Sequence, residues 1–130
     1  MVKAVKIETA LATQAPFEGR RPDTPEEELD ATFATLARTR ESGVFAGSFS
    51  GRSAWERHPN GDELVQVLAG FATVTVIDEA GRHELAMGAG TVTMVPRGCW
   101  HRFDAPDGVT VMTATPQPTE LYRGEDPREA

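Results

Sequence analysis

From Gly43 onward, glycines at fairly regular intervals divide the sequence into short segments rich in β-branched and aromatic residues. Short strands separated by turn residues are typical of a β-sandwich or a β-barrel. We expect eight strands, at residues 44–49, 53–58, 62–68, 71–78, 82–85, 91–95, 99–104 and 109–115. The sequence therefore predicts one all-β domain that covers residues 43–115.

The preceding residues, 1–42, are predicted to form an N-terminal extension with one short helix. Thr24 can cap this helix, Pro25 suits its first position, and Glu27 completes a capping box. Apolar residues then recur at helical spacing, at Leu29, Phe33 and Leu36. Because this periodicity indicates an amphipathic helix, we expect the helix to run to about Arg40.

Both ends of the chain are less regular. A short strand is suggested near the N-terminus by Val2, Val5 and Ile7. Residues 116–130 contain two prolines and a charged run, and we expect them to form a frayed C-terminal tail.

Charge and composition exclude several classes of function. The net charge is −7, the pI is about 4.9, and no stripe of Lys and Arg is visible, so we do not expect nucleic-acid binding. No apolar run approaches the roughly 20 residues of a membrane-spanning helix, so we expect no membrane association. The single cysteine, Cys99, excludes an internal disulfide framework. We therefore expect a cytoplasmic protein.

The first of two segments that combine metal-capable side chains with a turn lies at residues 56–63. Its His-Pro-Asn-Gly run, residues 58–61, fits a type I turn with Pro in the second position and Gly in the fourth. Such a turn can bring His58 and Glu63 close together, and strand alternation places Glu56 on the same face as His58.

The second segment repeats this arrangement. Residues 95–98, Val-Pro-Arg-Gly, are a turn candidate, and Cys99, His101 and Phe103 share one face of the strand that follows. Imidazole and carboxylate are the usual ligands of divalent metals where thiolates are not used. The two segments together predict a metal-binding pocket in a small β-barrel.

The chain resembles the cupin superfamily through both of that family's motifs. The first motif is matched by Gly51, Glu56, His58, Glu63 and Gly70, with four residues between His58 and Glu63 and six between Glu63 and Gly70. The second motif reads G-x5-P-x-G-x2-H, and every spacing is matched by Gly90, Pro96, Gly98 and His101. The resemblance covers roughly residues 43–115 and implies a jelly-roll barrel, the double-stranded β-helix of cupins, that forms a homodimer.

The resemblance implies that a divalent transition metal (Mn, Fe, Zn or Ni) is bound by Glu56, His58, Glu63 and His101. Glu56 replaces the histidine that usually begins the ligand set, and Ala105 replaces an asparagine that is not a ligand. The additional oxygen ligand favours Mn²⁺ or Fe²⁺. Alternatively, the metal is held by three residues or is absent, and Glu56 pairs with an arginine. An inward carboxylate should have a partner in either case.

Other conspicuous residues have simpler interpretations. His83 is expected at or near the surface, and Trp55 and Trp100 should point away from the pocket. Cys99 is expected to be a small apolar side chain, with a ligand or a nucleophile as the alternatives. Our candidates for the lining of the pocket mouth, besides a role in the core, are Met94, Phe103 and Met112.

The function that the resemblance implies is that of a metal-dependent enzyme of dioxygenase or isomerase type, acting on a small molecule. The alternatives are a non-catalytic module that binds a small ligand or a metal, and a cupin that has lost its metal. Cupins share a barrel but differ widely in chemistry, so the sequence identifies neither the substrate nor a catalytic residue. No Ser/His/Asp triad and no phosphate-binding glycine loop is apparent.

Overall fold

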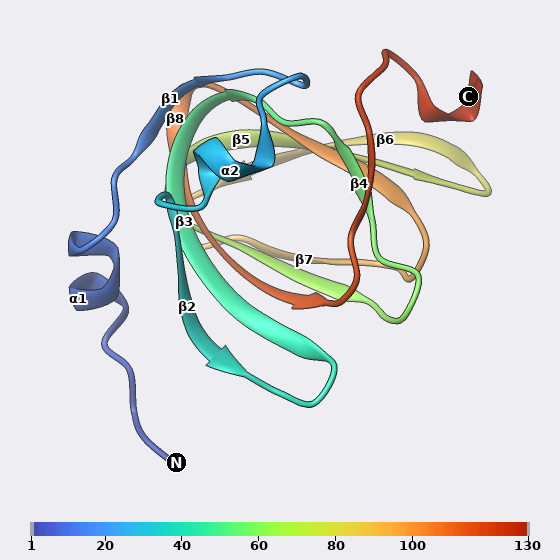
Figure 1. The fold of residues 1–130 in the computed structure, drawn as a ribbon. Helices are drawn as coiled ribbons and strands as arrows, with labels where there is room; N and C mark the ends of the chain where they lie inside the picture. The colour runs from blue at the N-terminus through green and yellow to red at the C-terminus, as the bar shows by residue number, and fades with distance from the viewer. Residues whose placement is uncertain (1, 130) are drawn as a thin grey trace.

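The computed structural model describes residues 2–129, and it shows a barrel of β-strands with short helical segments outside it, near both ends of the chain (Figure 1). The strands are β1 (Phe17–Arg20), β2 (Phe33–Arg38), β3 (Ser42–Arg52), β4 (Trp55–Arg57), β5 (Glu63–Asp78), β6 (Gly81–Gly88), β7 (Val92–Val95), β8 (Trp100–Pro116) and β9 (Glu120–Tyr122). The helical segments are α1 (Ile7–Ala12), α2 (Glu26–Leu29) and a 3₁₀ turn at Pro127–Glu129. The predicted all-β class with a short N-terminal helix is confirmed.

Two long strands organise the barrel. β8 pairs with β3, with β4 and with β5, and β5 also pairs with β6 and β7. Both β5 and β8 curve around a common interior (Figure 1). Because β8 pairs with three strands from different parts of the sequence, it brings residues that are distant in sequence close together in space.

The structure joins strands that the sequence analysis separated. Predicted strands 62–68 and 71–78 are parts of β5, and 99–104 and 109–115 are parts of β8. The glycines between them bend the strands without ending them: Gly70 has φ +75° and Gly108 has φ +100°. A Cβ atom at Gly70 would collide with the backbone of Gly108, so glycine permits the close approach of β5 and β8 here.

The predicted helix to Arg40 is wrong in its extent. Helix α2 ends at Leu29, and the segment from Phe33 forms β2, which pairs antiparallel with β3. Ala34 and Leu36 are both buried, so this segment also has the two-residue period of a strand, and pairing with β3 decides between the two patterns. Residue Pro25, rather than Thr24, is the N-cap of α2.

The ends of the chain also differ from expectation. Ile7–Ala12 is helix α1, whereas a strand was suggested there. The segment expected to be a frayed tail contains β9, which pairs with β4, and Trp55 Nε1 donates a hydrogen bond to the carbonyl of Glu125 at 3.0 Å. The division of the chain at residues 43 and 115 stays a prediction. β1 and β2 before it and β9 after it are hydrogen-bonded to barrel strands.

The main core fills one part of the barrel interior and consists of alternate residues of the long strands together with neighbours from other strands. Its members are Phe49, Val65, Val67, Ala72, Val74, Val76, Met87, Val95, Phe103, Ala105, Val109 and Val111. A second cluster, Ala34, Leu36 and Ala46, packs against apolar residues of α1 and against Met112. None of the helices in residues 2–129 has the length and apolar character that crossing a bilayer requires.

Candidate metal centre

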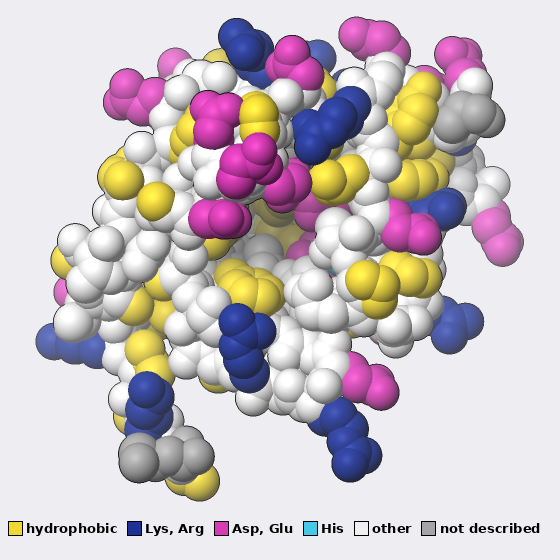
Figure 2. All heavy atoms as spheres, viewed as in Figure 1, with side chains coloured by type: hydrophobic (Ala, Val, Ile, Leu, Met, Phe, Trp, Pro, Cys, Tyr) yellow, Lys and Arg dark blue, Asp and Glu magenta, His cyan; other side chains and the backbone are white. Residues whose placement is uncertain are grey.

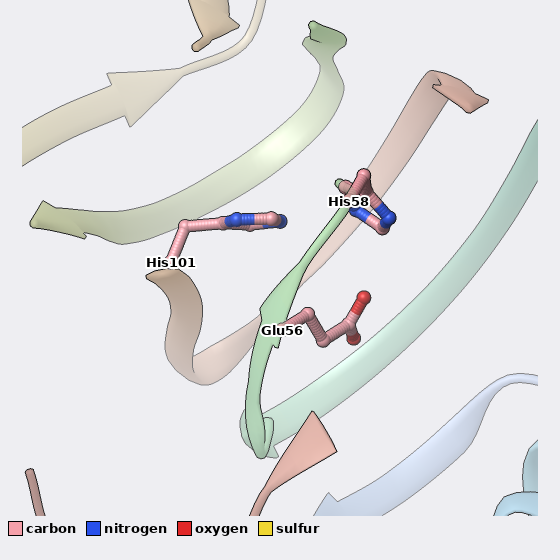
Figure 3. A group of neighbouring side chains, drawn as sticks. All are labelled: Glu56, His58 and His101. Carbon is pink, nitrogen blue, oxygen red and sulfur yellow. The ribbon is translucent and has the colours of Figure 1, made fainter. Parts of the chain in front are cut away.

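Three side chains converge where β4 and β8 meet. Glu56 lies on β4, His58 directly follows that strand, and His101 is the second residue of β8, opposite Glu56 in the strand pairing. The ligand-capable atoms of all three residues lie within 4.8 Å of one another. Figure 3 shows their side chains directed to a common space. The structure thus brings together residues from both predicted turn segments.

The two turns are joined by their backbones. The N–H of Gly98 donates to the carbonyl of His58 at 3.0 Å, and the N–H of Arg97 donates to Asp62 Oδ1 at 2.8 Å. Gly98 has φ +77°, a conformation that glycine adopts without a steric penalty. These bonds fix the distance between the segments that carry His58 and His101.

Glu63, the first residue of β5, completes the cluster. Its Oε1 lies 2.9 Å from His101 Nε2, and its Oε2 lies 3.3 Å from His58 Nε2. Neither contact has the alignment of a hydrogen bond. Within residues 2–129, His58 Nε2, His101 Nε2 and Glu63 Oε1 are buried polar atoms without a hydrogen-bond partner. Buried polar atoms are normally paired, so these three require an explanation.

The other atoms of these ligands are held by the surrounding protein. His101 Nδ1 donates to the carbonyl of Cys99 at 3.1 Å, and His58 Nδ1 lies 3.1 Å from Thr119 Oγ1. Thr115 Oγ1 donates to Glu63 Oε2 at 2.6 Å. A neutral histidine whose Nδ1–H donates a hydrogen bond has its free lone pair on Nε2, which is the arrangement of metal-binding histidines. Here both Nε2 atoms face the cluster.

The charges at the cluster call for a cation. Burial alone would raise the pKa of Glu63, but the adjacent His101 and His58 lower it to about 2. For His101, burial lowers the pKa, and the contact with Glu63 outweighs this effect and raises it. A carboxylate and two imidazole nitrogens around one point are stable with either a proton or a metal ion between them. The donor set fits a divalent transition metal.

Glu56 has a second partner. Arg20 Nη2 lies 3.5 Å from Glu56 Oε1, and the side chain of Glu56 is 20% exposed. The expected partner of this inward carboxylate is therefore present. Glu56 thus lies between this arginine and the two histidines, and its contact with Arg20 is long.

A cavity of about 410 Å³ opens beside the cluster. Figure 2 shows a hollow in the face that carries α2, with acidic side chains gathered near its edge. Aromatic side chains line much of its wall, namely Phe33, Phe45, Phe49 and Phe103. Glu56 and Glu63 reach it from the metal cluster, and Thr113, Thr115 and Thr119 add hydroxyl groups. This volume and lining are typical of a small-molecule site.

Of the three residues expected to line the mouth, the structure places only Phe103 there. The lining prediction is wrong for Met94 and Met112: Met94 is 54% exposed, and Met112 has the core role that was also expected of it, because it packs on the cluster that contacts α1. Alternation along β8 from His101 leads to Val111 as an inward residue, and Val111 does line the cavity.

The remaining conspicuous residues lie outside the cluster. His83 is at the surface, 2.8 Å from Asp78. Cys99 is half-buried and packs on the main core. Trp55 points away from the cavity as expected, but it is covered by the guanidinium of Arg102 at 4.5 Å. The sequence analysis did not find Arg20, Thr115 or Thr119, since they lie outside both motifs.

The fold and this site define a class of protein: a small jelly-roll barrel with a two-histidine, carboxylate-containing candidate metal centre beside a ligand cavity. The family model described as a cupin domain matches residues 49–114, which is 66 of the 130 residues. The chain belongs to the cupin family. The predicted resemblance is confirmed.

Solved structures support the fold. A cupin-2 domain protein from Shewanella frigidimarina is similar with a TM-score of 0.57 and 17% identity, over 74% of this chain and 96% of that chain. Hydroquinone 1,2-dioxygenase from Sphingomonas, with 4-hydroxybenzoate bound, gives 0.56 and 17%, over 64% of each chain. Oxalate decarboxylase of Bacillus subtilis, which has Mn(II) centres, gives 0.59 and 15%, over 68% of this chain and 26% of that chain. No match was found among curated proteins. Identities this low establish a shared fold alone.

Proposed function

We propose that this protein is a metal-dependent enzyme of dioxygenase or isomerase type that acts on a small molecule. The metal ligands in this proposal are His58, His101, Glu63 and Glu56. The observation that carries it is the group of three buried polar atoms without hydrogen-bond partners, next to a cavity of about 410 Å³. The cluster can bind a divalent metal, and the cavity beside it has space for a small-molecule ligand.

A divalent metal in this cluster would supply Lewis acidity toward a substrate oxygen or, as Fe²⁺, chemistry with O₂. The chain's own residues hold and orient the ligand side chains. Thr115 fixes Glu63. Thr119 and the carbonyl of Cys99 fix the two imidazoles, and four phenylalanines provide an apolar wall for the substrate. The oxygen-containing ligand set favours Mn²⁺ or Fe²⁺.

The activities of structural neighbours support an enzyme of this general kind. The similar proteins include a hydroquinone dioxygenase and a manganese-containing oxalate decarboxylase. Neither activity transfers to this chain by fold alone. A non-catalytic module that binds a small ligand or a metal is the alternative, and it differs from the enzyme in having no turnover.

The proposal includes a homodimer in the cytoplasm. Three large apolar side chains on β5 and β7 are exposed, as at a subunit interface: Phe71, Val92 and Met94. The single cysteine agrees with a reducing compartment. Sedimentation equilibrium would give the mass of the species in solution, and a monomer at micromolar concentration would contradict the dimer.

The test begins with protein purified without chelator, whose metal content is measured by elemental analysis. Protein loaded with Fe²⁺ is then assayed for O₂ consumption with a panel of hydroquinones and catechols. Protein loaded with Mn²⁺ is assayed by NMR for conversion of small hydroxy-carbonyl compounds. Turnover that requires metal and disappears in His101→Ala supports the enzyme. Binding of panel compounds without turnover favours the module, and protein that binds no divalent metal contradicts both.

A further inference from the structure

We propose that Arg20 makes the cavity selective for ligands that carry one carboxylate group on an apolar body, with the guanidinium binding that carboxylate. This inference rests on the proposed function, because it names the ligand class of the same site. It is carried by the way the structure builds Arg20 into the cavity wall.

The backbone of Arg20 is fixed by a close approach to Gly51. β1 runs parallel to β3 with these two residues opposite each other. Gly51 has φ +96°, and a Cβ atom there would collide with the carbonyl of Arg20. Such proximity is possible only at glycine, so the starting point of the arginine side chain is set by the fold.

The side chain of Arg20 is held in place by aromatic rings. The Arg20 guanidinium carbon lies 4.8 Å from the centre of the Phe49 ring and 5.9 Å from that of Phe33. These distances are those of cation–π contacts, which orient the guanidinium plane. Arg20 is 7% exposed, a rare burial for an arginine, and it lines the cavity.

Most hydrogen-bonding capacity of this guanidinium is unused. It has five N–H donors, and within residues 2–129 its one hydrogen bond is the 3.5 Å contact of Nη2 with Glu56. In residues 2–129, the fully buried side-chain atoms that lack a hydrogen-bond partner include no guanidinium nitrogen. The unpaired N–H donors of Arg20 are therefore accessible, and Arg20 lines the cavity. A buried charged group with one long hydrogen bond is poorly compensated, so further hydrogen bonds from a ligand would stabilise it.

The surrounding charges define what that partner is. When Glu56 serves as a metal ligand, its charge is shared with the metal, and Glu26, which forms no hydrogen bond with Arg20 in residues 2–129, is the other carboxylate that acts on the guanidinium. A carboxylate matches the planar fork of a guanidinium in two parallel hydrogen bonds. Glu26 and Asp30 also line the cavity, so an anion of higher charge, such as a phosphate, would meet repulsion. The phenylalanine wall suits an apolar body on the same ligand.

The test uses benzoate as the probe and benzamide as its neutral counterpart, each titrated calorimetrically into metal-loaded protein. We expect wild type to bind benzoate about tenfold or more tightly than benzamide, since hydrogen bonds between charged groups are about twice as strong as neutral ones. Arg20→Gln should abolish this preference and leave the affinity for benzamide unchanged. Arg52→Gln is the matched control, because Arg52 pairs with Asp104 at 3.1 Å outside the cavity; it should keep the preference.

Unchanged benzoate affinity in Arg20→Gln would overturn the inference, because the metal alone would then account for binding. Equal affinity of wild type for the two probes would also overturn it. If Arg20→Gln does not fold, Glu56→Gln in metal-free protein decides the matter. Removing the competing carboxylate should strengthen benzoate binding several-fold and leave benzamide binding unchanged, and no gain for benzoate would contradict the role of Arg20.

The two proposals fail separately. Protein without a divalent metal by elemental analysis would contradict the metal-dependent function. The benzoate preference is measured on metal-free protein in that case, and its dependence on Arg20 still decides this inference.

Discussion

Gly98 donates its backbone N–H to the carbonyl of His58, so one hydrogen bond joins the two turns that supply the candidate metal ligands. Each turn follows from local sequence, but neither alone assembles a site. The bond places His101, three residues after Gly98, next to His58. The site is therefore a property of the contact between turns, and substitutions on either side of that contact test it.

The first prediction concerns the ligands. His101→Ala should lower metal affinity by roughly a hundredfold or more, because losing only a partner of a ligand costs about 10- to 100-fold. Elemental analysis of protein dialysed against metal-free buffer measures the effect. His83→Ala is the control, since His83 pairs with Asp78 at the surface. Equal metal content in wild type and His101→Ala would refute the assigned centre.

The second prediction tests the alignment of the first motif. Glu56→Ala should lower metal content or change the preferred metal, because Glu56 lies within 4.8 Å of the histidine nitrogens. Asn60→Ala should change neither, because Asn60 is exposed in the turn and donates to the carbonyl of Gln117 at 2.9 Å. Competitive loading with Mn²⁺ and Zn²⁺ provides the measurement. Glu56→His should shift the preference toward Zn²⁺. The reverse pattern for the first two variants would mean that the motif is aligned wrongly.

The third prediction concerns the partner of Glu63. Thr115→Val removes the 2.6 Å hydrogen bond to Glu63 Oε2 while keeping the shape of the side chain. We expect metal affinity to fall by about 10- to 100-fold, with the fold retained. Thr115→Ser should restore affinity, because it restores the hydroxyl. Thr110→Val, which removes a contact with Ser48, should leave metal affinity unchanged. A Thr115→Val protein with wild-type affinity would show that Glu63 needs no such support.

The fourth prediction is a pH dependence of metal-free protein. The pKa of Glu63 is lowered from 4.5 to about 2, so its contribution to stability is present above pH 4.5 and is lost as pH falls toward 2. The pKa of His101 is raised above 6.5, so its contribution is present below pH 6.5 and is lost as pH rises through the raised value. Both contributions are complete between these limits. We expect urea denaturation midpoints to be highest near pH 4.5 to 6.5 and this optimum to disappear in Glu63→Gln.

Metal should change the basic side of this profile. Metal ligation requires a neutral imidazole, so metal binding releases the proton that His101 shares with Glu63. The affinity of the site for metal therefore increases as pH rises through the pKa of His101. Metal-loaded protein should therefore not lose stability above pH 6.5. A metal-loaded protein that follows the profile of the metal-free form would show that the ion binds elsewhere.

Local sequence signals predicted strands within β3 to β8, because glycine, proline and residue alternation act over a few residues. The second turn lies one residue later than predicted, since the N–H of Cys99 donates to the carbonyl of Pro96 at 3.1 Å. Local signals also indicated Glu56, His58, Glu63 and His101, whose spacings are those of two short motifs. Arg20 could not be found in this way, because its place beside Glu56 depends on the parallel pairing of β1 with β3. The end of α2 was missed because Phe33 and Leu36 satisfy helical spacing, while Ala34 and Leu36 satisfy strand spacing.

The error at Met112 has a different cause. Residues 99–104 and 109–115 were treated as separate strands, so the inward positions were not counted from one to the other. In the structure β8 is continuous, and the buried positions keep the parity of His101 through Phe103, Ala105, Val109 and Val111. The information was present in the sequence, but it becomes usable only when the strand is known to continue through Gly108.

One strand thus begins at one candidate ligand, His101, and ends near another, because Thr115 at its far end holds Glu63. Since side chains alternate, the number of residues between these two positions fixes which way each of them faces. Between Val109 and Thr115, β8 pairs with β3 without a register shift. Insertion or deletion of a single residue there would turn Thr115 away from Glu63, whereas a change of two residues preserves its orientation. Variation in the length of this stretch should therefore occur in steps of two.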